Sequence, residues 1–79
     1  MGTPAMHEES AVVIVWNADE GWGVARLDIA KLDVWIHFSA IDAPANSYRS
    51  LTPGQRVLCR YEMATQDGYT ARAAWVRAQ

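Results

Sequence analysis

The sequence has little of what marks disulfide-bonded, metal-binding or membrane proteins. Its single cysteine, Cys59, excludes an intramolecular disulfide, and Cys59, His7 and His37 show no spacing such as CxxC or HxxxH that would bind a metal ion. No apolar run approaches the roughly 20 residues of a membrane-spanning helix, and the N-terminus lacks the basic and apolar stretches of a signal peptide. We therefore expect a cytoplasmic protein that uses no membrane, metal or cofactor and is stabilised by packing.

Catalytic motifs are missing as well. The chain has no nucleophile elbow, no carboxylate pair of the glycosidase type and no phosphate-binding loop. Gly21-Trp22-Gly23 contains only the first two glycines of a dinucleotide-binding motif, and a strand is predicted after it where that motif needs a helix. We therefore expect a protein that is not an enzyme.

The chain also lacks the excess of basic residues that is common in nucleic-acid-binding proteins. Seven basic and nine acidic residues give a formal net charge of -2. Two of the acidic residues, Glu8 and Glu9, lie in residues 1–10, which leaves seven of each sign in residues 11–79. Any affinity for nucleic acid should therefore depend on stacking more than on charge.

The length of 79 residues allows one domain with one small core. Residues 1–10 show no apolar periodicity and are predicted to be a flexible leader, with the domain at 11–79. β-Branched residues, alternation and turn residues predict five strands, and a long connection that contains one helical turn at 39–41 separates the third from the fourth. The strands are expected at 11–16, 22–27, 33–38, 55–63 and 69–77.

Five short strands with one long middle connection predict an all-β protein, a small five-stranded antiparallel Greek-key barrel, although an SH3-like barrel has compatible spacing. Strand alternation places Gly23, Ala25 and Leu27 inward, and Trp22 and Val24 outward. The same rule places an aromatic ring and an imidazole, at 35 and 37, on one face of the third strand. Outward aromatic rings can stack on unpaired bases, but in so small a domain they can equally belong to the core.

Several segments resemble bacterial cold-shock proteins, and they occur in the same order. Residues 17–24 are similar to the NADKGFGFI segment of that family, and residues 33–41 to its DVFVHFSAI segment. Residues 48–57 resemble YKSLxEGQKV, and residues 73–76 the closing AANV. The resemblance covers nearly all of residues 11–77.

The resemblance implies an oligonucleotide-binding (OB) barrel whose second and third strands present aromatic rings to single-stranded DNA or RNA. Trp22 and Trp35 occupy positions of stacking phenylalanines, and His37 and Phe38 match an HF pair. Among the arginines, Arg26 and Arg60 are favoured as phosphate contacts. The candidate nucleic-acid-binding residues are Trp16, Trp22, Val24, Arg26, Trp35, His37, Phe38, Tyr48 and Arg60.

The departures from the family pattern predict weaker or narrower binding. Val15 stands where a stacking Trp is expected and Ile14 where a Lys is, while Trp16 either compensates or packs. Val24 replaces a second phenylalanine, and Glu20 a lysine. Two lost stacks, at about 1–3 kcal/mol each, would weaken binding by a factor of about ten to thousands.

Two functions from different classes follow. The first is a single-strand binder, expected to be a monomer, that acts as a nucleic-acid chaperone or as a regulator of transcription or translation. The second is a barrel that has lost much of this affinity and uses an apolar face to contact a protein or to form a homodimer. Ile29 and Leu32, in the loop after the second strand, either pack locally or form an apolar spot for a partner.

Overall fold

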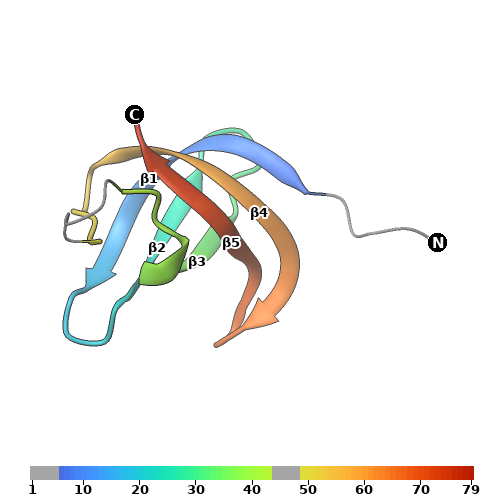
Figure 1. Ribbon diagram of the computed structural model, residues 1–79. Helices are drawn as coiled ribbons and strands as arrows, with labels where there is room; N and C mark the ends of the chain where they lie inside the picture. Colours follow the sequence, from blue (N-terminus) through green and yellow to red (C-terminus); the bar gives the residue numbers. More distant parts are fainter. Residues whose placement is uncertain (1–5, 44–48) are drawn as a thin grey trace.

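A closed barrel of five strands contains nearly all of the regular structure (Figure 1). The computed structural model describes residues 6–43 and 49–79. Around the barrel the order is β1-β2-β3-β5-β4, and β1 pairs with β4 to close it. The elements are β1 (His7–Asn17), β2 (Trp22–Leu27), β3 (Asp33–His37), the 3₁₀ turn η1 (Phe38–Ala40), β4 (Arg56–Gln66) and β5 (Tyr69–Ala78).

This topology confirms the predicted five-stranded barrel of the OB and cold-shock type. Four of the five neighbouring strand pairs are antiparallel, while β3 and β5 run parallel, so the prediction of an antiparallel barrel needs this one correction. The parallel pairing is possible because a long connection and all of β4 separate β3 from β5 along the chain. Among the residues described, no helix is long and apolar enough to cross a bilayer.

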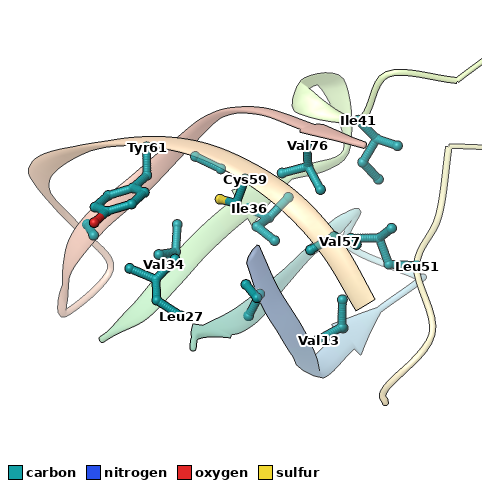
Figure 2. Close-up of a cluster of buried hydrophobic side chains, with 14 residues drawn as sticks. Val13, Leu27, Val34, Ile36, Ile41, Leu51, Val57, Cys59, Tyr61 and Val76 are labelled. Atoms are coloured by element: carbon teal, nitrogen blue, oxygen red, sulfur yellow. The ribbon is translucent and has the colours of Figure 1, made fainter. Parts of the chain in front are cut away.

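The core fills the barrel with aliphatic side chains from every strand (Figure 2). Strand alternation turns these residues inward, and each fully buried Val, Leu or Ile contributes about 1.5–3 kcal/mol. Tyr61 lies at one end of the cluster, and Ile41 and Leu51 lie at the other (Figure 2). The largest fully buried side chains of this cluster are Val13, Leu27, Val34, Ile36, Val57, Cys59 and Val76.

The β4–β5 hairpin has the turn that its sequence predicts. Asp67 and Gly68 both have positive φ, 50° and 87°, and Gln66 pairs with Tyr69 across them. Two central residues with positive φ favour the I′ turn, whose twist matches that of the strands, and Asp-Gly suits it because both residues tolerate this conformation.

The N-terminal segment forms part of the barrel, which corrects the predicted boundary of the flexible leader. β1 begins at His7, and residues 7–12 pair with β4. One carboxylate oxygen of Glu9 accepts hydrogen bonds from the backbone N–H groups of Ile29 and Ala30, the latter at 2.9 Å. The prediction of a leader over 1–10 is therefore wrong for residues 7–10, because their backbone groups complete the β1–β4 ladder; residues 1–5 lie outside the described part.

Glu9 thus supports the β2–β3 loop, whose two apolar residues behave differently. Leu32 is partly buried and packs against the core, as local packing predicts. Ile29 is 83% exposed. The loop is therefore held by polar contacts from β1 and by one of its two large apolar side chains.

Removing the Glu9 carboxylate should destabilise the protein. We expect Glu9→Ala to lower the free energy of unfolding by about 1–3 kcal/mol, because two backbone donors lose a charged acceptor. Urea unfolding followed by far-ultraviolet circular dichroism measures this change. The control is Glu8→Ala, which removes a surface ion pair and should cost less than about 1 kcal/mol. Equal losses in the two variants would contradict the assigned role of Glu9.

Stability should also fall at alkaline pH because the thiol of Cys59 is fully buried. Burial, with a smaller effect from Glu9, raises the pKa of Cys59 from 9.0 to about 12. Below pH 9 both the folded and the unfolded chain keep the thiol proton, so the contribution of the protonated thiol to stability is fully present there. Between about 9 and 12 only the unfolded chain loses the proton, and stability decreases by at most about 1.4 kcal/mol per pH unit.

The measurement is the free energy of unfolding in urea at a series of pH values from about 8 to 11. Burial also raises the pKa of the Tyr61 hydroxyl, so a part of the slope should persist without the thiol. We expect the slope to become shallower in Cys59→Ala. An unchanged slope in that variant would show that the thiol does not contribute to the loss of stability at alkaline pH.

Candidate nucleic-acid interface

Adjacent outward positions on β2 and β3 carry the predicted aromatic residues. In the antiparallel register Trp22 faces His37 and Val24 faces Trp35, whereas Gly23 and Ala25 pair with core residues of β3. Because alternation separates the two sets, the aromatic rings lie on the outside of the barrel. Trp22, Trp35 and His37 are each partly buried, so each ring retains some exposed surface.

Three of the rings pack against one another in sequence. The ring centroids of Trp35 and His37 are 5.9 Å apart with an interplanar angle of 27°, and those of His37 and Phe38 are 4.5 Å apart. Phe38 is 42% exposed. We call the four residues Trp22, Trp35, His37 and Phe38 the aromatic face. Tyr48, also predicted to contribute, lies outside the described residues.

Backbone contacts of Gly21 position the end of this face. Gly21 accepts a hydrogen bond from the backbone N–H of Phe38 at 2.8 Å, and a Cβ at Gly21 would lie 2.9 Å from the phenyl ring. With φ at +75°, Gly21 also has a conformation that favours glycine. The absence of a side chain here lets the ring of Phe38 lie close to the β1–β2 turn.

Hydrogen bonds set the orientation of His37 and Trp22. The Nδ1 atom of His37 accepts from the backbone N–H of Ser39 at 3.3 Å and lies 2.7 Å from the Ser39 hydroxyl, so the hydrogen of the neutral ring belongs on Nε2. The indole N–H of Trp22 donates to Glu20 at 2.8 Å. A carboxylate therefore lies at the rim of the aromatic face, where it repels phosphate groups.

The structure corrects the prediction that Val24 is exposed. Val24 has the outward register, between Val15 of β1 and Trp35 of β3, but it is only 1% exposed. An outward position in a barrel can still be covered when larger side chains flank it on both neighbouring strands. Val24 therefore supports the neighbouring side chains and is not available to a ligand.

Trp16 packs against the core and does not extend the aromatic face. A register shift between Val13 and Val15 reverses the alternation of β1, so that Val15 is 45% exposed and Trp16 pairs with Gly23 on the inner side. A Cβ at Gly23 would overlap the indole of Trp16 and the carbonyl oxygen of Val15. Of the two alternatives for Trp16, packing is the one that the structure supports.

The two arginines favoured as phosphate contacts lie in different places and are both ion-paired. Arg26 pairs with Asp33 across the β2–β3 ladder at 2.9 Å, and this pairing raises the pKa of the guanidinium. Arg60 pairs with Glu8 at 2.7 Å and lies on β4, so it does not belong to the aromatic face. A phosphate would have to compete with a carboxylate at each of these positions.

A tryptophan that the sequence analysis did not single out lies beside Arg60. The β4–β5 register pairs Arg60 with Trp75, which lies within the segment that resembles AANV. Its signal in the sequence is one large aromatic residue between small and aliphatic neighbours, next to an arginine at position 77. Only the pairing of β4 with β5 brings these residues together. Within residues 6–43 and 49–79, no cluster of three or more His, Cys, Asp or Glu side chains could hold a metal ion.

Comparison with known proteins agrees with this arrangement. No protein-family model matches the chain. The chain is 33% identical over 70 residues to the Cold shock-like protein CspG of Escherichia coli, and equally to that of Shigella flexneri. Each alignment covers 87% of this chain and 91% of the relative.

The strand order and the outward aromatic residues of β2 and β3 define a small OB-type barrel with an aromatic surface. Within that class, the 33% sequence identity to CspG, over 87% of this chain and 91% of the relative, decides the family. The protein belongs to the cold-shock family, as a divergent member, and the resemblance stated from its sequence motifs is confirmed.

Filling the space above Gly23 should disrupt the packing of Trp16. We expect Gly23→Ala to lower the free energy of unfolding by about 3 kcal/mol, because the added methyl group meets a backbone carbonyl oxygen that cannot move alone. Urea unfolding measures the loss. Gly54→Ala is the control: its Cβ meets nothing within 4 Å, and it should cost only the strain of a positive φ, about 1–2 kcal/mol. Similar losses for both would mean that the indole does not lie over Gly23.

Proposed function

We propose that this protein binds single-stranded RNA or DNA by stacking bases on the aromatic face. The observation that carries the proposal is the packed series of rings Trp35, His37 and Phe38, with Trp22 paired across the ladder to His37. A run of neighbouring rings suits unpaired bases, which expose their flat faces, and each stack contributes about 1–3 kcal/mol. A duplex buries those faces and should bind much more weakly.

Charge contributes little to binding at this face. The negatively charged Glu20 accepts a hydrogen bond from Trp22 at the rim of the face, and the charge of Arg26 is neutralised by Asp33. The net charge of the whole chain is -2. Binding at the aromatic face therefore releases few counterions and should depend only weakly on salt.

In the cytoplasm such a protein would act as a nucleic-acid chaperone or as a regulator of transcription or translation. Because it binds the open strand and not the hairpin, it shifts the equilibrium between them toward the open form by mass action. The proposal includes no ATP and no covalent step. Fewer of the predicted residues can contact a base than the sequence suggested, since Val24 is covered and the ring of Trp16 packs inward.

One observation favours the alternative function, a protein-interaction or dimerisation module. Ile14 and Val15, adjacent in β1, are 43% and 45% exposed, and neither carries a polar group. Exposed apolar side chains of this kind can pack against another chain. A protein that used this surface would associate in a concentration-dependent way and respond little to oligonucleotides.

Substitutions within the aromatic face test the proposal. We expect short oligo-dT to quench the intrinsic Trp fluorescence saturably, and Trp22→Ala and Phe38→Ala each to weaken binding by about 5- to 150-fold, equivalent to one lost stack. Phe38→Ala is informative because it leaves all four tryptophans in place. Ile29→Ala, which removes an exposed apolar side chain from the β2–β3 loop, is the matched control and should bind normally.

A matched duplex should produce no saturable quenching. If the folded protein binds neither oligo-dT nor single-stranded RNA, and sedimentation shows association that is lost in Val15→Lys, the alternative function replaces this one.

A further inference from the structure

The outer surface of β4 and β5 carries a second aromatic and basic cluster. The guanidinium carbon of Arg60 lies 4.5 Å from the ring centroid of Trp75, and that of Arg77 lies 5.2 Å from it. Arg60 is the register partner of Trp75, and Arg77 follows two positions later on the same side of β5. We call Arg60, Trp75 and Arg77 the β4–β5 cluster.

The indole positions both guanidinium groups without using their hydrogen-bond donors. A guanidinium over an aromatic ring is attracted by the ring quadrupole, and its N–H groups remain directed outward in its own plane. Such a group can still bind two oxygens of a phosphate. Both side chains are exposed, that of Arg60 by 53%. The described residues provide Arg77 with no ion pair, and they provide Arg60 only with Glu8.

The cluster lies within reach of a strand that leaves the aromatic face. β5 lies between β3 and β4 in the barrel (Figure 1), and Trp35 of β3 pairs with Arg72 of β5. Beyond η1, Ile41 bridges to Val76, the neighbour of Trp75, so the segment that follows the aromatic face runs beside the part of β5 that carries the cluster. Adjacent strands are about 4.8 Å apart, which places β4 about 10 Å from β3.

The two surfaces differ in what they can contact. The aromatic face offers rings, but its arginine is neutralised by Asp33 and its rim carries Glu20. The β4–β5 cluster offers two cations over an indole that they already cover, and only one of them, Arg60, is ion-paired among the described residues. Rings for bases and cations for phosphates are the two components of a single-strand groove, and here they lie on neighbouring parts of the barrel.

We propose that the β4–β5 cluster binds the phosphodiester backbone of the single strand after it leaves the aromatic face. This inference rests on the proposed function and extends it: the bound strand runs from β2 and β3 across β5 to β4. Glu8 competes with phosphate for Arg60 and thus limits the affinity.

The length and salt dependence of binding test this path. Dissociation constants are measured by fluorescence anisotropy for labelled oligo-dT of about four and about ten nucleotides, within the range that one OB barrel binds, over a series of salt concentrations. The variants are Arg60→Gln and Arg77→Gln. The matched control is Arg56→Gln, which removes the same charge from β4 but is paired with Asp28 and lies outside the cluster.

For the longer oligonucleotide, we expect each cluster variant to weaken binding several-fold and to reduce the salt slope of log K by about 0.7, the value of one phosphate contact. The shorter oligonucleotide should bind every variant equally. Glu8→Gln should strengthen binding of the longer oligonucleotide because it frees Arg60 for phosphate. Arg56→Gln should leave both oligonucleotides unaffected.

Three results would overturn the inference. The first is a loss of affinity that is the same for both lengths, or no larger than that of Arg56→Gln. The second is that Arg60→Gln and Arg77→Gln weaken binding of a duplex as much as binding of the longer single strand, which would indicate a general anion-binding patch. In either case binding of the short oligonucleotide leaves the proposed function intact. The third is no binding of either length by the folded protein, which overturns the proposed function and this inference together.

Discussion

Closure of the barrel through β1 is the constraint on which the rest of the structure depends. Residues 7–12 of β1 pair with β4 and residues 11–17 with β2, and the register shift between Val13 and Val15 lies within the β1–β2 pairing. That shift turns Trp16 inward and leaves Val15 exposed, so the same irregularity closes one side of the core and shapes the surface beside the aromatic face. Glu9, on the first half of the strand, adds hydrogen bonds to the β2–β3 loop. One strand therefore connects the stability of the barrel with the geometry of its surface.

Strand alternation made much of the fold and part of the site predictable from the sequence. The five strands, the Asp67-Gly68 turn and the outward register of Trp22, Trp35 and His37 follow from a period of two and from turn chemistry. These features depend on residues that are close together along the chain. The order of the motifs also sufficed to identify the family before any fold was known.

The errors have a different origin, since they depend on contacts between distant segments. Val24 has the outward register, but whether it is covered depends on its neighbours on β1 and β3. Residues 7–10 have no periodic pattern of their own and become ordered by pairing with β4. The β4–β5 cluster likewise requires the cross-strand register, because positions 60 and 75 are far apart in the sequence. Local pattern does not contain this information.

The separation of inner and outer residues along each strand has an evolutionary consequence. Core residues such as Ile36 and Val34 alternate with Trp35 and His37 on a single short strand, so neighbouring positions have different physical requirements. A substitution at an exposed outward position, unlike the covered Val24, changes what the surface binds while the interior stays the same. This barrel can therefore lose a ring on one side and gain an aromatic or basic group on another in independent steps. The binding surface of such a protein can move around an unchanged scaffold.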